Sequence, residues 1–373
     1  MRRTLIVTND FPPRQGGIQS FVHELAMRQP EGSVVVYASD HDGSARFDAA
    51  QPFPVVRAGT GMLLPTPSAR RQAVRTLHAH GCTAVWFGAS APLGLLAPTM
   101  RAAGAQRIVA STHGHEVGWA MLPGARQALR RIGQHCDIVT YLGEYTHHRL
   151  RGAFGPHAAM RRLTPGVDVE TFHPGVDGSA VRARYGLLER PVIVCVSRLV
   201  HRKGQDSLIR ALPAIREQVP GAALLIVGSG PYRAALASIA ERAGVAQHVV
   251  LTGAVPWAAL PAHYAAGDVF AMPCRTRRAG MDVEGLGIVY LEASATGLPV
   301  LAGDSGGAPD AVRDGETGFI VDGRDEQAVA ERLTLLLGDA DLRARFGSAG
   351  RAWVQRDWRW DVVAGQLTEM LQG

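Results

Sequence analysis

The stretch that decides the fold is "PVIVCVSRLVHRKGQDSLIRALPAIREQ", residues 191–218. Its first part, 191–197, is a short apolar run rich in β-branched residues, which is typical of a buried parallel strand. A polar loop follows, and the stretch 204–218 then predicts a helix. A strand, a loop and a helix in this order form the repeating unit of a doubly wound α/β sheet.

The same alternation of short apolar runs and amphipathic stretches continues on both sides of this unit. The runs before it lie at 4–8, 33–39, 83–89, 107–112 and 137–143. The runs after it lie at 223–230, 248–253, 268–273 and 298–303. The stretch 163–179 is rich in proline and glycine and has no clear period, so we place a domain boundary there. The sequence therefore predicts two α/β domains in tandem, each binding ligands at the carboxyl ends of its strands.

Composition and charge exclude several classes of protein. With 46% hydrophobic and 19% charged residues, the chain of 373 residues has an ordinary globular composition. Its four cysteines lie far apart without a C-x-x-C pair, which indicates reduced thiols rather than a zinc knuckle or a disulfide framework. The N-terminal apolar run is too short for a signal peptide, and no window approaches the roughly 20 apolar residues of a membrane-spanning helix. The net charge of +6 suits nucleic acid, an anionic membrane or a phosphorylated substrate, but arginines spread without aromatic residues argue against nucleic acid.

Lys203 is the only lysine, although the chain has 39 Lys and Arg residues. It lies between the strand 191–197 and the following helix, five residues after Arg198. A helix N-terminus with a guanidinium and an ammonium beside it is an anion site, and a pyrophosphate fits it. A solvated surface lysine is the alternative, but a sole lysine in this loop favours the anion site.

Two motifs of the first domain also follow predicted strands. Gly16 and Gly17 open the first helix and allow close backbone approach at its N-terminus, or they merely form a turn. His113 follows the strand at 107–112, where it is a candidate general base or hydrogen-bond donor to substrate, with a structural histidine as the alternative. His115 and Glu116 are nearby, but the pattern is not H-E-x-x-H and no fourth metal ligand is evident.

The segment 282–322 contains two glutamates around the start of a predicted helix. Glu284 precedes a glycine pair, and Glu292 follows it by eight residues on that helix. Glu284 is placed to accept hydrogen bonds from sugar hydroxyls and Glu292 from a ribose, although an acidic residue near a helix start also occurs for purely structural reasons. Backbone N–H groups at 286–289 are placed to face an anion. The glycine loop at 228–230 is a weaker signal for a nearby nucleoside.

Taken together, these segments resemble the family-4 retaining glycosyltransferases of GT-B fold. The shared motifs run through nearly the whole chain: "GGIQ" at 16–19, "PGVDVETFHP" at 165–174, "SRLVHRKG" at 197–204, "GSGPY" at 228–232 and the run at 284–321. The resemblance implies an α/β protein in which two Rossmann-like doubly wound domains face each other across a cleft. It implies an acceptor-binding domain at 1–168, joined by a crossover helix at 358–373, and a nucleotide-sugar-binding domain at 169–357.

The resemblance also implies a role for each motif residue. Arg198 and Lys203 hold the donor diphosphate, Glu284 binds the donor sugar, and His113 contacts that sugar near the reacting carbon. The implied catalytic set is therefore His113, Glu284, Arg198 and Lys203. Glu292 binds the nucleoside ribose, the backbone at Val255 meets the base, and the two glycines of the first domain close over the diphosphate. The further donor-binding residues are Gly16, Gly17, Gly228, Gly230, Gly285, Leu286, Gly287 and Ile288.

Three longer segments are similar to the bacterial phosphatidylinositol monomannoside mannosyltransferases, which add an α-mannose from GDP-mannose to a glycosylated phosphatidylinositol. They are "NDFPPRQGGIQS" at 9–20, "THGHEVGW" at 112–119 and "MPCRTRRAGMDVEGLGIVYLEA" at 272–293. Asp10 and Arg14 are then placed to meet the acceptor, Arg14 through its phosphate. The stretch 59–80, which joins an apolar patch to arginines, and the basic stretch 124–133 are candidate contacts with an anionic membrane face, or simply solvated helix faces. We therefore expect a cytoplasmic protein, peripheral at the inner face of the membrane.

The expected reaction is hexose transfer with retention of the anomeric configuration. Arg198, Lys203 and the helix start near Gly285 would meet the charge of the leaving diphosphate, and no D-x-D motif is present, so we expect no metal and no cofactor beyond the donor. Two alternatives stay open: an enzyme of the same family with another nucleotide sugar or a non-lipid acceptor, and a non-catalytic nucleotide-sugar sensor.

Overall fold

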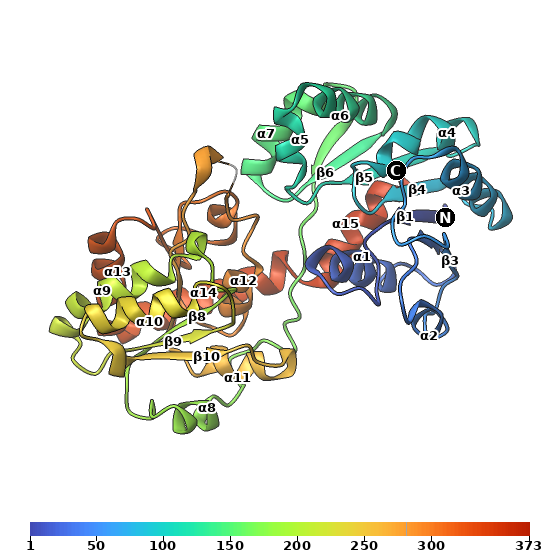
Figure 1. Ribbon diagram of the computed structural model, residues 1–373. Helices are drawn as coiled ribbons and strands as arrows, with labels where there is room; N and C mark the ends of the chain where they lie inside the picture. Colours follow the sequence, from blue (N-terminus) through green and yellow to red (C-terminus); the bar gives the residue numbers. More distant parts are fainter. Residues whose placement is uncertain (281) are drawn as a thin grey trace. The chain divides into compact units, whose positions relative to one another are not determined.

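The protein is described here from a computed structural model that places residues 1–280 and 282–373. It divides into two compact units, Met1–Gly166 together with Trp360–Gly373, and Val167–Arg359 (Figure 1). In the first unit seven strands form one sheet in the order β3-β2-β1-β4-β5-β6-β7, and all neighbours are parallel. The strands are β1 (Thr4–Thr8), β2 (Val34–Ala38), β3 (Val55–Arg57), β4 (Ala84–Phe87), β5 (Arg107–Ser111), β6 (Ile138–Tyr141) and β7 (Ala159–Arg162).

Helices cover both faces of this first sheet (Figure 1). Successive strand residues point to opposite faces, so on β1 Leu5 and Val7 pack against one helical layer while Ile6 packs against the other. The first layer consists of α3 (Pro67–Ala79), α4 (Ala97–Ala102), α5 (Glu116–Met121), α6 (Pro123–His135) and α7 (Glu144–Phe154). The second consists of α1 (Gly17–Met27) and the C-terminal helix α15 (Trp360–Gln372). The short helices α2 (Ser44–Asp48) and η1 (Leu93–Leu96) complete the unit.

The second unit has a six-stranded parallel sheet in the order β10-β9-β8-β11-β12-β13. Its strands are β8 (Val192–Val196), β9 (Ala223–Val227), β10 (Val249–Gly253), β11 (Val269–Met272), β12 (Val300–Gly303) and β13 (Gly318–Val321). Its helices are α8 (Ser179–Arg184), α9 (Gln205–Gln218), α10 (Arg233–Arg242), α11 (Leu260–Ala265), α12 (Ile288–Ala295), α13 (Glu326–Gly338) and α14 (Ala340–Asp357). Single 3₁₀ turns are η2 (His201–Lys203), η3 (Ala246–His248), η4 (Trp257–Ala259), η5 (Arg278–Gly280) and η6 (Ala308–Ala311).

The predicted fold class, α/β with two Rossmann-like doubly wound sheets, is confirmed. Three edge or near-edge strands, β3, β7 and β13, did not stand out as apolar runs. In β7 this is because its four residues are mostly exposed and include two arginines, so they carry no signal of burial. That the two units face each other across a cleft stays a prediction.

Each sheet has one point where the strand order reverses, and ligands of doubly wound proteins bind outside the carboxyl ends of the strands at such points. In the first unit this point lies between β1 and β4, and in the second it lies between β8 and β11. The loops that follow these four strands are therefore where a site is expected. Among the described residues, none of the helices has the length and apolar composition needed to cross a membrane.

Candidate active site

The loop after β8 holds both predicted diphosphate ligands, but in different surroundings. Arg198 follows the strand directly and is exposed, whereas Lys203 ends the turn η2 and is only 8% exposed. Gly204 follows with a φ of 75°, and a Cβ there would collide with the carbonyl oxygen of Pro273. A left-handed residue without a side chain therefore lets the loop after β8 pack against the end of β11 and begin α9.

Lys203 forms an ion pair with Glu284, although 81 residues separate them in the sequence. Lys203 Nζ lies 2.7 Å from Glu284 Oε2, and the two side chains are 11% and 7% exposed. Among the described residues that oxygen accepts no hydrogen bond of normal geometry, so the contact is an ion pair rather than an aligned hydrogen bond. Arg202 contributes a second, longer contact of 3.9 Å from its Nε to the same oxygen.

A cavity of about 500 Å³ opens at the carboxyl ends of β8 and β9. Four of the predicted donor-binding residues line it: Arg198, Gly228, Gly230 and Val255. The two glycines are required by packing, because a Cβ at Gly228 would collide with the Ser197 backbone and one at Gly230 with the Leu199 backbone. This close packing of the 228–230 loop against the end of β8 shapes the cavity wall.

Glu292 lies on α12, three residues after Val289, which lines the same cavity. Its Oε2 accepts a 2.6 Å hydrogen bond from the hydroxyl of Tyr264 on α11. Burial raises the pKa of Glu292, and the hydrogen bond from Tyr264 partly opposes that rise. Residues three apart on a helix share one face, so Glu292 lies on the face of α12 from which Val289 reaches the cavity.

The start of α12 is built from the predicted glycine pair. Gly287 caps the helix with a φ of 79°, and Leu286 before it is buried while Gly285 and Ile288 are half-buried. The N–H of Gly307 donates a 2.9 Å hydrogen bond to the carbonyl oxygen of Glu284, which ties this loop to the segment after β12. The helix N-terminus, Glu284 and Lys203 are thus held by one set of loops.

In the first unit, Gly16 and Gly17 lie at the exposed N-terminus of α1. A Cβ added at Gly17 would meet no atom within 4 Å, and its φ is not positive, so neither packing nor backbone conformation calls for glycine there. Asp10 accepts a 2.8 Å hydrogen bond from the side chain of Gln19 on α1, and Arg14 is exposed. The space beside Gly17 is therefore open, whereas a Cβ at Gly16 would collide with the side chain of Gln19.

His113 follows β5 and is fixed through its ring. Its Nε2 lies 2.6 Å from the carbonyl oxygen of Gly88, at the end of β4, and its ring meets Phe21 edge to face. Because a carbonyl only accepts, Nε2 carries a proton and donates it. Burial lowers the pKa of His113, with the charge of Glu116 acting in the opposite direction. A neutral ring in this tautomer leaves Nδ1 as a hydrogen-bond acceptor.

Two buried carboxylates hold the loops of the candidate site, and this role was not predicted from their sequence positions. Glu116 is fully buried, and its carboxylate accepts hydrogen bonds from Ser90 Oγ at 2.9 Å and from the N–H of His113 at 3.0 Å. Asp206, 3% exposed, holds the guanidinium of Arg275 through two 2.8 Å contacts. The available signal was an acidic residue in the first turn of a helix after a glycine-containing loop, which is common for capping alone. Within the described residues no group of three or more His, Cys, Asp or Glu side chains has the arrangement of a metal site.

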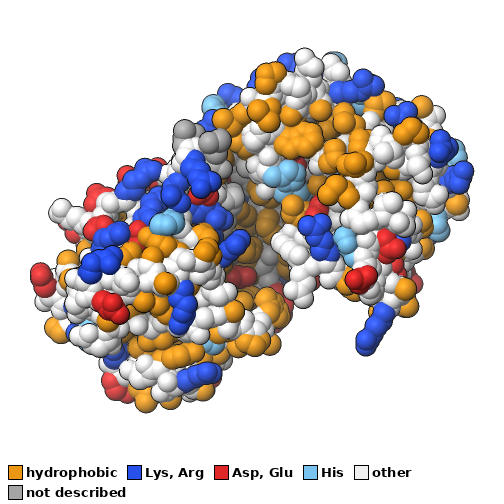
Figure 2. Space-filling model, in the orientation of Figure 1, with side chains coloured by type: hydrophobic (Ala, Val, Ile, Leu, Met, Phe, Trp, Pro, Cys, Tyr) orange, Lys and Arg blue, Asp and Glu red, His pale blue; other side chains and the backbone are white. Residues whose placement is uncertain are grey.

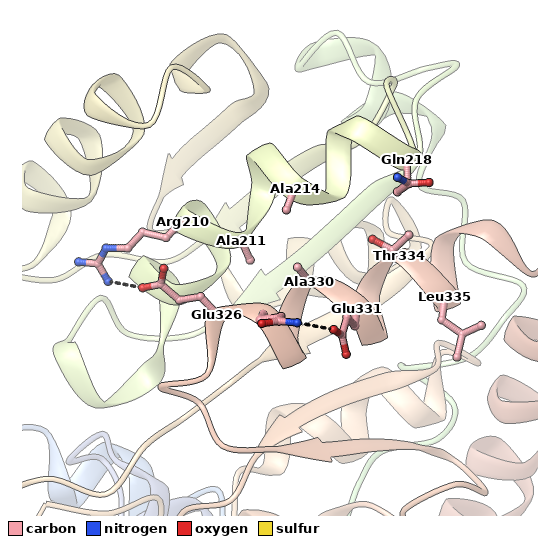
Figure 3. Close-up of a pocket in the computed structure, with 10 residues that line it drawn as sticks. Arg210, Ala211, Ala214, Gln218, Glu326, Ala330, Glu331, Thr334 and Leu335 are labelled. Atoms are coloured by element: carbon pink, nitrogen blue, oxygen red, sulfur yellow. Dashed lines mark hydrogen bonds and ion pairs between the residues drawn. The ribbon is translucent and has the colours of Figure 1, made fainter.

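A further cavity, of about 550 Å³, lies on the second unit between α9 and α13 (Figure 3). Its wall carries an ion pair of 3.4 Å between Arg210 and Glu326 and a mostly apolar floor that includes Ala211 and Ala214. None of the predicted site residues lines it.

Comparisons with known proteins match both units of the chain. The family model described as Glycosyltransferase Family 4 matches residues 15–171, and the one described as Glycosyl transferases group 1 matches residues 180–353. The crystal structure of Anabaena HepE in complex with UDP superposes with a TM-score of 0.81 over 99% of both chains at 20% identity. The glycosyltransferase WaaG superposes with a TM-score of 0.66, over 99% of this chain and all of that one, at 18% identity. The two-sheet fold and both family matches define the class of protein as glycosyltransferases of GT-B fold.

Relatives with higher identity narrow the class. The GDP-mannose-dependent α-(1-6)-phosphatidylinositol monomannoside mannosyltransferase of Mycobacterium tuberculosis is 53% identical over all of this chain and 99% of its own. The protein of the same description from Mycolicibacterium smegmatis is 54% identical over 99% of this chain and 98% of its own. A monoacylated-acceptor counterpart from Corynebacterium glutamicum is 47% identical over 100% and 98%. The chain belongs to the family of phosphatidylinositol monomannoside mannosyltransferases.

Proposed function

We propose that this enzyme transfers an α-mannosyl residue from GDP-mannose to a phosphatidylinositol monomannoside, with retention of configuration and without a metal. The observation that carries the proposal is the buried ion pair of Lys203 and Glu284, which lies at the same carboxyl end of the second sheet as a cavity of about 500 Å³. The full-length identity to relatives so described supports GDP-mannose as donor and the mannosylated lipid as acceptor. Another acceptor within the family and a non-catalytic sensor remain as outcomes of the experiments below.

The donor would lie across the carboxyl end of the second sheet. The nucleoside occupies the cavity beside Val255, Gly228 and Gly230, and its ribose hydroxyls donate to Glu292. Arg198 at the cavity wall and the N–H groups from Leu286 to Ile288 meet the diphosphate. The N–H groups at the start of α12 are fixed by the backbone before the donor arrives, so they need no reorganisation as charge develops on the leaving group.

Lys203 and Glu284 would act together on the scissile bond. An ammonium has three N–H donors, so Lys203 can keep its contact with Glu284 and still offer two donors to phosphate oxygens. The ion pair fixes the position of the Glu284 side chain, whose other carboxylate oxygen then accepts a hydrogen bond from a hydroxyl of the mannose. The bond between the sugar C1 and the phosphate oxygen breaks, the acceptor oxygen bonds to C1 from the same face, and the acceptor proton passes to the departing phosphate.

In the first unit, His113 and the glycines of α1 take the further roles that the family resemblance implies. The neutral ring of His113 accepts a hydrogen bond at Nδ1 from a sugar hydroxyl near the reacting carbon. Gly16 and Gly17 close over the diphosphate, which the open space beside Gly17 admits, while Asp10 and Arg14 meet the acceptor. Because guanidinium and ammonium groups supply the positive charge at the leaving group, we expect turnover to continue in the presence of a chelator.

The acceptor would place the enzyme at the inner membrane face. The 59–66 loop exposes Met62 and Leu64, and α3 beside it carries Arg70, Arg71 and Arg75. Apolar side chains beside arginines match the boundary of an anionic bilayer, where each basic residue contributes about 1 kcal/mol.

Donor and acceptor selectivity tests the proposal. Calorimetry is expected to give GDP the highest affinity, at least about tenfold above UDP and ADP, because a site that hydrogen-bonds a base leaves polar groups unpaired with the wrong one. Purified phosphatidylinositol monomannoside should gain one mannose, and NMR should assign it the α configuration. Tight GDP binding with no transfer to any acceptor would favour the sensor, and preference for another nucleotide would contradict the donor.

Gly17 offers a test that separates ligand approach from folding. Replacing Gly17 with alanine is expected to lower kcat/KM at least about tenfold, because the methyl group fills the space proposed for the diphosphate. The melting temperature should stay equal or rise, since alanine in a helix with free space stabilises by about 0.4–1 kcal/mol. The matched control is Gly365→Ala, another exposed helical glycine with no atom within 4 Å, which should change stability alone. Equal activity of the two variants would remove Gly17 from the site.

A further inference from the structure

A separate cavity of about 480 Å³ adjoins the Lys203–Glu284 pair on the second unit. Val200, His201, Arg202, Pro231, Tyr232, Arg277, Arg278 and Asp282 line it, and it shares no lining residue with the cavity assigned to the nucleoside. Arg202 connects this cavity to the ion pair, because its Nε lies 3.9 Å from Glu284 Oε2. It therefore lies next to the proposed reacting centre but outside the proposed donor site.

The charge on this cavity is unbalanced. Three arginines line it against one carboxylate, that of Asp282. The ion pairs to that carboxylate are long, at 3.8 Å from Arg202 Nε and 3.7 Å from Arg277 Nη1. Within residues 1–280 and 282–373, the Arg278 guanidinium contacts no carboxylate. Positive charge left without a protein partner in a concave site favours an anionic ligand.

The loop that presents these arginines is anchored at its base. Asp206 holds Arg275, and the N–H of Arg275 donates a 2.8 Å hydrogen bond to the carbonyl oxygen of Arg202. Beyond it, Arg277 and Asp282 exchange backbone hydrogen bonds of 2.9 and 3.2 Å and form an antiparallel bridge. These contacts fix the two ends of the loop and leave the side chains of Arg277 and Arg278 over the cavity.

Arg278 also has a φ of 50°, and among the described residues it is the only one other than glycine in the left-handed region. This conformation is costly for a residue with a side chain, and such residues cluster at ligand sites. A glycine here would relieve the backbone but would remove the guanidinium from the cavity. Lys and Arg side chains gather on the face of this unit shown in Figure 2.

We propose that this cavity is a second anion site, which binds the phosphodiester of the acceptor headgroup through Arg277 and Arg278. A guanidinium matches phosphate oxygens with two parallel hydrogen bonds. The volume falls within the range of about 300–1,000 Å³ typical of small-molecule sites, which favours a phosphate carrying an organic group over a free anion. The inference rests on the proposed function, since it assigns part of the lipid acceptor.

The direct test is calorimetry on the full chain saturated with GDP. The probes are glycerophosphoinositol, inorganic phosphate and myo-inositol, and the variant is Arg277→Ala with Arg278→Ala. Wild-type protein should bind glycerophosphoinositol, and the double variant should bind it about tenfold more weakly while its Kd for GDP stays within about twofold. The control is Arg242→Ala, an exposed arginine at the end of α10, which should bind all probes as the wild type does. The Kd for myo-inositol, which lacks the phosphate, should be the same in the wild type, the double variant and the control.

Steady-state kinetics should show the same difference, with acceptor binding weakened and donor binding unchanged. The double variant is expected to raise KM for the lipid acceptor about tenfold, with kcat and KM for GDP-mannose within about twofold. Wild-type protein that binds no glycerophosphoinositol, or a double variant that binds it normally, would overturn the site. Wild-type protein that binds inorganic phosphate as tightly as glycerophosphoinositol would overturn the headgroup assignment, because the organic group would then add nothing to the affinity. If no lipid is mannosylated but probe binding depends on the two arginines, the proposed function fails and the anion site stands.

Discussion

Replacing Lys203 with alanine is expected to lower kcat/KM for mannosyl transfer by about 10²–10³, the usual loss when one fixed donor to a developing negative charge is removed. The proposed leaving group is a diphosphate, and Lys203 is the buried cation nearest Glu284. Lys203→Arg should restore little of this activity, because a flat guanidinium does not reproduce a compact ammonium at a position where the native residue is only 8% exposed. Initial rates with GDP-mannose and the lipid acceptor measure both variants.

The same substitution has a cost in stability that must be measured separately. Removing Lys203 leaves the carboxylate of Glu284 with only the 3.9 Å contact to Arg202, so a loss of about 1–3 kcal/mol is expected. Lys203→Ala with Glu284→Gln removes the unpaired charge and should recover stability without recovering transfer. Near wild-type turnover in a correctly folded Lys203→Ala protein would remove Lys203 from the mechanism.

The single lysine also permits a chemical test on the unaltered protein. An amine-reactive reagent has two targets, the α-amino group of Met1 and the ε-amino group of Lys203. The fraction of Lys203 modified, measured by mass spectrometry, should equal the fraction of transfer activity lost at each time. Saturating GDP should slow both the modification and the loss of activity at least about tenfold, because the bound diphosphate covers Lys203. Labelling of Lys203 at the same rate with and without GDP would show that the diphosphate lies elsewhere.

Replacing Asp206 with asparagine is expected to lower the free energy of unfolding by about 3 kcal/mol at pH 7, since removing one partner leaves a buried charge without compensation. Burial by itself would raise the pKa of Asp206, but hydrogen bonds and charges of Arg275 and Arg210 outweigh it and lower that pKa. A carboxyl with a lowered folded-state pKa stabilises the fold above its unfolded value of about 3.9. This stabilisation disappears as the pH falls through the lower, folded-state pKa.

The difference in stability between wild type and Asp206→Asn should therefore be large at neutral pH and shrink below about pH 4. Chemical unfolding at several pH values measures it. The matched control is Asp341→Asn, an exposed acidic residue in the first turn of α14, which should change stability by less than about 0.5 kcal/mol at any pH. A gap for Asp206→Asn that stays constant with pH would show that its charge is not what stabilises the loop.

Much of the fold and part of the site could be predicted from local patterns. Short β-branched runs between amphipathic stretches determined two parallel sheets with helices on both faces, because such strands must be covered on both sides. The polar and glycine residues that follow these strands marked Lys203, Glu284 and His113 as candidates, since ligands bind at the carboxyl ends of parallel strands. The strand β7 was missed because its exposed arginines give no signal of burial.

Only the tertiary structure decided which of these side chains meet. The strand order places β11 beside β8, although two strands separate them in the chain, and this brings Glu284 within 2.7 Å of Lys203 while Arg198 stays exposed at a cavity wall. The same strand order brings Asp206 into contact with Arg275 and places Arg202 and Arg277 around a second cavity. Residue order alone could not give these contacts, because a local pattern determines which elements form, whereas the pairing of their loops follows from strand order and close backbone packing.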